Sequence, residues 1–178
     1  MGYFTDKYLP YYTIEERDRW EGDWELVEGI PYALTSSSVV HQETVVNIVY
    51  QIKSQLLNCG EECKVIVDID YYISKDTVVR PDVVIVCQKI EDRLTVVPDV
   101  VFEVVSPSSV KMDEHIKYQI YQQEKVKYYI LVYPQDLKKI KVYKLDKDGY
   151  KKEFEGFEGN YQIDLEKCKI NLDVSKII

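Results

Sequence analysis

The stretch VVPDVVFEVVSPSS, residues 96–109, decides the fold. Its middle is nearly all apolar, which is typical of a strand that is covered on both faces of a sheet. A second stretch, VVRPDVVIVC at residues 78–87, also places an apolar run after Pro-Asp and predicts a neighbouring strand. Pro81 cannot donate a hydrogen bond to a ladder, so we expect it at an edge or a bulge. The first stretch also carries one carboxylate, Glu103, whose burial is costly unless it is paired or bound to a metal.

Strand and helix patterns alternate along the rest of the chain. Strand patterns occur at residues 24–34 (two short strands), 64–74, 127–133 and 138–154, the last being a hairpin that turns at Asp148-Gly149. Helical periods occur at residues 39–58 and 107–126, with Gly60 as a C-cap of the first and Ser108 or Ser109 as an N-cap of the second. This order predicts an α/β domain around a mixed sheet, with a last edge element near the C-terminus.

Length and composition limit the class of protein. The 178 residues suit one domain spanning 1–178, and the sequence contains no apolar run long enough to cross a membrane. Because the start MGYFTDKYLPYY lacks an apolar segment, we also expect no signal peptide. We therefore expect no membrane partner and a cytoplasmic location. The net charge of −8 argues against a protein that binds nucleic-acid phosphates over much of its surface, although it allows a local basic groove. The four cysteines (Cys59, Cys63, Cys87 and Cys168) do not have zinc spacing, so we expect reduced, mostly buried thiols.

Two carboxylates are the strongest candidates for chemistry. If the two apolar strands pair, Asp82 and Glu103 meet at one end of the sheet, and two hard oxygen donors on adjacent strands suit Mg²⁺. Lys117, on the following helix, is placed to orient a water or to offset charge on a phosphate. The alternatives are a buried salt bridge for Glu103, a turn contact for Asp82, and an exposed i,i+4 pair with Asp113 for Lys117.

Four other residues are weaker candidates. His41 begins the first helix, where a histidine more often caps or packs than acts as a base. Glu25 lies in a short strand, where solvated surface is the simpler expectation. Arg80 and Lys111 are candidates for phosphate contact, against the ordinary expectation of exposed side chains.

Several motifs follow one another in an order that resembles the Uma family of "putative restriction endonucleases", within the PD-(D/E)xK nuclease superfamily. They are DWELVEGIPYAL, SSVVH, VRPDVVIV, VPDVVFEVVSPSS, DEHIKYQIYQQEKVKYYILVYP and KKIKVYKL. The resemblance covers nearly the whole chain from about Tyr11. It implies a restriction-endonuclease-like core (αβββαβ) with extra N-terminal strands and a C-terminal hairpin, and cleavage of DNA with Mg²⁺ or Mn²⁺. It also implies self-association as a homodimer.

The resemblance also assigns residues by position. Asp82 matches the Asp of the PD motif and Glu103 matches the second acid, so both are implied metal ligands. The superfamily pattern has a lysine two residues after the second acid, but this sequence has Val105 there, and Lys117 is the matching displaced position. Glu25 and His41 match recurring family positions as supporting residues.

Three functions remain open. The first is a metal-dependent DNA endonuclease that uses Asp82, Glu103 and Lys117. The second is a catalytically weak or inactive nuclease-fold protein that acts as a binding module, which the acidic composition favours. The third is hydrolysis of another phosphodiester, such as RNA or a nucleotide, by the same chemistry.

Overall fold

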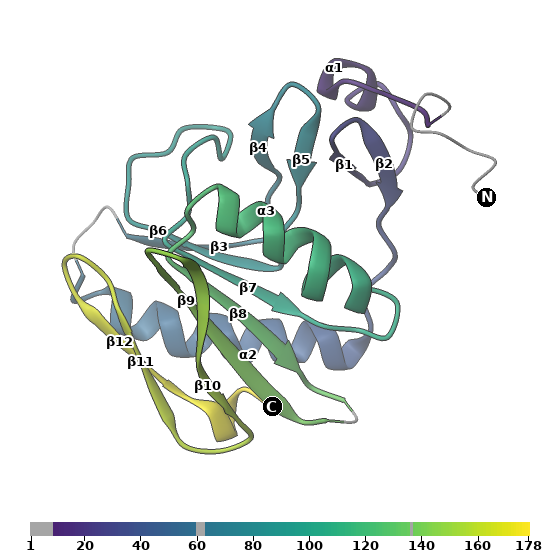
Figure 1. The fold of residues 1–178 in the computed structure, drawn as a ribbon. Helices are drawn as coiled ribbons and strands as arrows, with labels where there is room; N and C mark the ends of the chain where they lie inside the picture. The colour runs from purple at the N-terminus through teal and green to yellow at the C-terminus, as the bar shows by residue number, and fades with distance from the viewer. Residues whose placement is uncertain (1–8, 60–62, 136) are drawn as a thin grey trace.

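A six-stranded mixed sheet forms the centre of the molecule (Figure 1). The computed structural model describes residues 9–59, 63–135 and 137–178. The strand order is β10-β9-β8-β7-β6-β3, and β7 and β8 are parallel whereas the other pairs are antiparallel. The strands are β3 (Lys64–Val67), β6 (Val83–Val86), β7 (Val100–Val104), β8 (Tyr128–Tyr133), β9 (Lys139–Asp146) and β10 (Gly149–Gly156). The predicted mixed central sheet and the hairpin are therefore confirmed.

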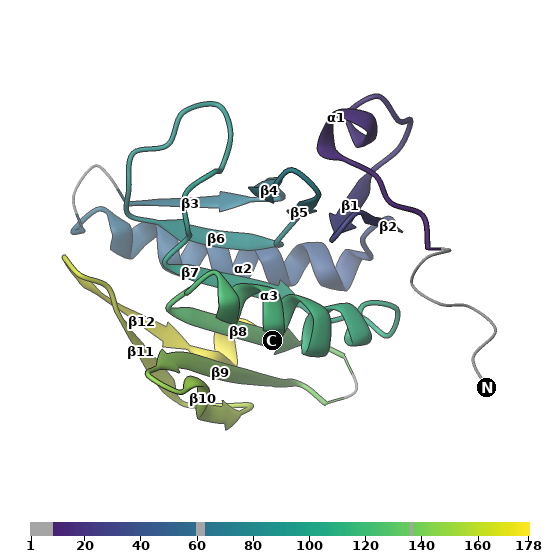
Figure 2. The same ribbon diagram turned by 45° about the horizontal axis from the view of Figure 1, so that its top comes forward.

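Helices cover both faces of this sheet (Figure 2). Helix α2 (Val39–Leu56) packs on one face, and the π-helix η2 (Met112–Lys117), continued by α3 (Tyr118–Gln123), packs on the other. The side chains of β7 alternate between these two cores, as a strand covered on both faces requires. Phe102 packs on the α2 side, and Val101 and Val105 pack on the α3 side. Glu103 consequently points toward α3.

A smaller sheet stands beside one end of the central sheet, at the upper right of Figure 1. Its strand order is β2-β1-β5-β4, with β1 (Trp24–Val27), β2 (Ile30–Ala33), β4 (Tyr71–Ser74) and β5 (Thr77–Val79). The short helix α1 (Ile14–Arg17) precedes it and is capped by Thr13 in a capping box.

Two predicted strands are each broken in the structure. The strand predicted over 64–74 divides at Asp68, which has a φ of +51°, and the next strand divides at Arg80-Pro81-Asp82. Pro81 lacks the N–H that a continuing ladder needs, and the left-handed backbone at Asp68 ends an extended strand. At both breaks the chain passes between the central sheet and the smaller sheet. Asp82 therefore lies where the two sheets meet.

The C-terminal segment forms a second hairpin rather than a single edge element. Strands β11 (Asn160–Asp164) and β12 (Lys169–Asp173) pair with each other, and the 3-10 helix η3 (Val174–Lys176) follows. Gln51 and Gln55 of α2 hydrogen-bond to the backbone of β12, so the hairpin lies along one flank of that helix. The predicted C-cap at Gly60 lies outside the described residues.

The prediction of reduced thiols is wrong. Cys59 is bonded to Cys168, and Cys63 is bonded to Cys87. The second pair follows the register of β3 and β6, which places these residues opposite each other, and the first follows from the C-terminal hairpin folding back on α2. No local sequence pattern predicts either disulfide. Disulfides persist mainly in oxidising compartments, so they weigh against the cytoplasmic location, which stays a prediction.

No helix of the described residues is long and apolar enough to cross a membrane.

Candidate active site

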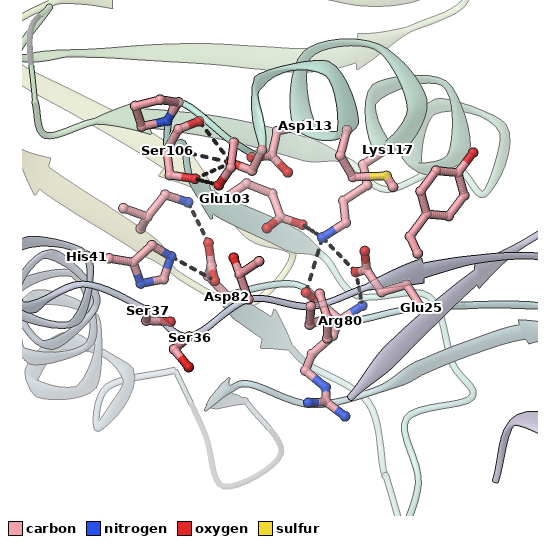
Figure 3. A pocket seen from close by; sticks show the side chains of 18 of the residues that line it. Glu25, Ser36, Ser37, His41, Arg80, Asp82, Glu103, Ser106, Asp113 and Lys117 are labelled. Carbon is pink, nitrogen blue, oxygen red and sulfur yellow. Dashed lines mark hydrogen bonds and ion pairs between the residues drawn. The ribbon is translucent and has the colours of Figure 1, made fainter. Parts of the chain in front are cut away.

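A pocket of about 710 Å³ opens where the smaller sheet, the N-terminal end of α2 and η2 meet (Figure 3). All five residues that the sequence singled out as catalytic or supporting line it: Glu25, His41, Asp82, Glu103 and Lys117. They come from β1, α2, the β5–β6 break, β7 and η2, respectively. The fold thus brings together residues that are up to 92 positions apart in the sequence (Glu25 to Lys117).

Glu103 and Lys117 form a buried ion pair at the floor of the pocket. The Lys117 ammonium lies 3.0 Å from Glu103 Oε1, and Tyr121 donates its hydroxyl to the same oxygen at 3.0 Å. Glu103 is 2% exposed and Lys117 is 4% exposed. Burial raises the pKa of Glu103 well above its ordinary value, and the Lys117 charge offsets only part of that effect.

Glu25 belongs to the same network, and the expectation that it is solvated surface is wrong. Its Oε1 lies 2.9 Å from the Lys117 ammonium and accepts the backbone N–H of Arg80 at 2.7 Å. Lys117 also donates to the backbone carbonyl of Arg80 at 3.2 Å. The three hydrogens of the ammonium therefore have three acceptors. The Lys117 bond to the Arg80 carbonyl and the Glu25 bond to the Arg80 N–H together hold the chain at the β5–β6 break. Burial alone would lower the pKa of Lys117, but Glu103 and Glu25 hold it well above its ordinary value.

Asp82 and His41 form the more open side of the site. His41 Nε2 lies 3.2 Å from Asp82 Oδ1, and Asp82 Oδ2 accepts the backbone N–H of Val104 at 2.7 Å. The hydrogen bond with Asp82 raises the pKa of His41 despite partial burial. His41 Nδ1 is buried and has no hydrogen-bond partner among the described residues. Asp82 keeps 23% of its side chain exposed, so it remains accessible from the pocket.

Asp113 is a site residue that the sequence reasoning missed. The alternative of an exposed Asp113–Lys117 pair is wrong, because both side chains are on the buried side of η2. Burial raises the pKa of Asp113 to about 6. The apolar period predicts Met112, Ile116, Ile120 and Tyr121 as the inward stripe, but of these only Tyr121 is fully buried, and the inward line is Asp113, Lys117 and Tyr121. A π-helical turn changes the residue period, and no sequence signal indicates it here.

The two candidates for phosphate contact differ. The Arg80 guanidinium is engaged by Asp70 and Asp23, each at 2.8 Å. Lys111 is exposed and lines the pocket, together with the exposed Ser36, Ser37 and Ser108 and the partly buried Ser106. Lys111 and the serines, rather than Arg80, are thus placed to contact a substrate.

The charges of the site are unbalanced. Six carboxyl groups line the pocket (Asp23, Glu25, Asp68, Asp82, Glu103 and Asp113), beside the cationic or ionisable side chains of His41, Arg80, Lys111 and Lys117. Among the buried members of this lining, the three carboxyl groups of Glu25, Glu103 and Asp113 face a single ammonium, that of Lys117. A further cation would relieve this excess, and carboxylate oxygens are the ligands that Mg²⁺ prefers. Among the described residues no three His, Cys, Asp or Glu side chains converge as a preformed metal site. The donor set therefore fits an ion that takes one or two carboxylates and completes its shell with waters and substrate oxygens.

Comparisons with known proteins agree with this fold. The Uma2 family, described as "Putative restriction endonuclease", matches residues 7–173. The structure also resembles that of a "putative nuclease belonging to DUF820" from Anabaena variabilis, with a TM-score of 0.73 and 14% sequence identity. That alignment covers 93% of this chain and 97% of the other, so the two share a fold. None of the curated proteins compared with the chain matches it.

Proposed function

Because the chain belongs to the Uma2 family of "putative restriction endonucleases", we propose that it hydrolyses DNA phosphodiester bonds with the help of Mg²⁺ or Mn²⁺. Asp82 and Glu103 are the proposed metal ligands, and Lys117 holds Glu103 in place. The observation that carries the proposal is the excess of buried carboxylates in one pocket, because a divalent cation would neutralise it. Residues with perturbed pKa values in a cleft are also typical of functional sites.

Each residue has a defined task in this proposal. A divalent ion bound there would neutralise charge on the phosphate and help to ionise a water. Asp82 is oriented by His41 and by the Val104 N–H, which fix both of its oxygens. Glu103 is oriented by Lys117 and Tyr121 through a single oxygen, Oε1. Lys111 and the serines at the mouth bind the phosphates on either side.

Lys117 acts here through charge and position. All three of its ammonium hydrogens have protein acceptors, so it offsets the carboxylates and fixes Glu103 rather than donating to the substrate. The location of Lys117 also explains how position 105 can carry valine in place of the lysine of the superfamily pattern. The side chain of residue 105 packs on the α3 side of the sheet, and Lys117 reaches the same region from the helix.

Calorimetric titration with Mg²⁺ and Mn²⁺, run beside nicking of supercoiled DNA, tests the proposal. We expect Asp82→Asn and Glu103→Gln to abolish both metal binding and nicking, because each removes one of only two proposed ligands. Glu91→Gln is the matched control, since it removes one exposed acid outside the pocket. Nicking that survives both Asp82→Asn and Glu103→Gln would exclude the site. RNA and nucleotide substrates in the same assay identify the phosphodiester that is cleaved.

One observation favours the second function, a binding module without catalysis. The Lys117 ammonium already lies beside Glu103, as in a buried salt bridge of purely structural value. In that case wild-type protein binds neither metal and nicks no DNA, while Glu103→Gln lowers stability. The same calorimetric titration therefore separates the two functions.

A further inference from the structure

The outer face of α2 carries a stripe of apolar side chains that nothing in the described structure covers. Tyr50 is 77% exposed and Leu57 is 81% exposed, and a groove of about 640 Å³ lies along this face beside Val67 of the edge strand β3. The opposite side of the helix packs on the central sheet, and one flank is covered by β12. Exposed apolar side chains in a contiguous row are typical of an interaction surface.

The spacing of this stripe is that of a coiled-coil seam. Its exposed positions follow one another at intervals of four and three residues from one end of the helix to the other: Val39, Glu43, Val46, Tyr50, Lys53 and Leu57. Such alternation is the a/d pattern by which two helices pack along their length. Four of the six positions are apolar, and the two that are not carry opposite charges.

These charges determine what can cover the stripe. Glu43 and Lys53 are about 15 Å apart along the helix axis at 1.5 Å per residue, so they cannot reach each other within one chain. Neither has an ion-pair partner among the described residues. A second copy in parallel orientation would place like charges opposite each other, whereas an antiparallel copy centred at position 48 places Glu43 opposite Lys53.

The same antiparallel register also matches the apolar positions. It pairs Val46 with Tyr50 and Val39 with Leu57, so every position of the stripe meets a complementary one on the partner. A surface that complements itself about a two-fold axis is the definition of an isologous dimer interface. We propose that this face of α2 is the interface of a homodimer, in which two α2 helices pack antiparallel and form two Glu43–Lys53 ion pairs.

Charge reversal tests this geometry without reference to catalysis. Sedimentation velocity over a concentration series should show a wild-type dimer. Glu43→Lys and Lys53→Glu should each weaken it by about tenfold or more, because each creates two like-charge contacts in the interface. Glu91→Lys and Lys147→Glu, which make the same charge changes at exposed positions off the helix, should leave the dimer unchanged. Circular dichroism confirms that each variant is folded.

Two combinations show that the loss comes from the contact between positions 43 and 53, whereas the single reversals identify the antiparallel register, because a parallel dimer would have two like-charge contacts both before and after each reversal. The double variant Glu43→Lys/Lys53→Glu should dimerise like wild type, because both pairs are restored with reversed polarity. A mixture of the two single variants should form a heterodimer, because one carries only lysines and the other only glutamates at these positions. A wild type that stays monomeric throughout, a dimer that neither reversal weakens, or a mixture that fails to associate would each overturn the proposal.

Discussion

Replacing Lys117 with methionine should destabilise the protein in a strongly pH-dependent way. The ammonium lies 2.9 Å from Glu25 and 3.0 Å from Glu103, and both carboxylates are buried. Methionine keeps most of the side-chain volume but leaves the two carboxylates without their shared counter-charge. Breaking a buried ion pair from one side costs about 3–5 kcal/mol, so we expect a loss of about 3 kcal/mol or more in the free energy of unfolding at pH 8.

The loss should shrink as the pH falls. Burial already raises the pKa of Glu103 in the wild-type protein, and removing Lys117 raises it further, because the lysine is what lowers it. A carboxyl group whose pKa is raised on folding stabilises the folded state below its unfolded pKa and loses that contribution as the pH rises through its folded pKa. As the pH falls toward 5, protonation of Glu103 therefore removes the negative charge that the missing lysine no longer balances. The variant should then recover most of the lost stability.

Urea unfolding followed by tryptophan fluorescence at pH 8 and pH 5 measures both values. Lys111→Met is the matched control, because it removes an exposed lysine from the rim of the same pocket. We expect the control to change stability by less than about 0.5 kcal/mol at either pH. A Lys117→Met loss that is under about 1 kcal/mol at pH 8, or that is equal at both pH values, would refute the reasoning, since it would mean that the carboxylates do not depend on the lysine.

Three further predictions concern stability. The pKa of Asp113 is raised from 3.8 to about 6, so its contribution to stability is lost as the pH rises through 6. Lowering the pH from 8 to 5 should therefore add about 1 kcal/mol through this group, and Asp113→Asn should remove that increment in the same urea titrations. Reducing the Cys59–Cys168 bond, which spans 109 positions, should cost about 4–5 kcal/mol by loop entropy, and equal unfolding midpoints with and without reductant would contradict this. Tyr121→Phe should cost about 1–3 kcal/mol, because the buried Glu103 loses a hydrogen bond, and calorimetric melting should show it as a lower Tm.

The central sheet and the core of the site could be predicted from the sequence because their signals are local. Long apolar runs mark covered strands, and Glu103 stood out because a carboxylate is unexpected in such a run. The register of β6 and β7 pairs Val83 with Phe102, and this places Asp82 beside Glu103 as predicted. That Lys117 reaches Glu103 agrees with the position that the family resemblance implied.

The remaining features depend on contacts that no local pattern encodes. Glu25 is buried because the smaller sheet closes over the β5–β6 break, whereas the sequence predicted one strand there, with Pro81 at an edge or a bulge and no passage into a second sheet. Asp113 is buried because of the π-helical turn, whereas an α-helical period assigned it to solvent. The disulfides depend on the final approach of distant segments, above all of Cys168 to α2.

The π-helical turn of Met112–Lys117 has a consequence for how this chain tolerates changes in length. Such a turn holds one residue more than an α-helical path. It carries Asp113 and Lys117 itself, and it joins the Ser106–Ser109 rim to α3, which carries Tyr121. Deleting one residue there would restore a uniform helix and swing everything upstream by about 100° around the axis. Asp113 and the Ser106–Ser109 rim would then turn away from Glu25 and Glu103, the carboxylates on the strands, while the sheet stayed intact. Single-residue insertions and deletions in this turn, rather than substitutions, are thus the changes that would abolish the alignment while sparing the fold.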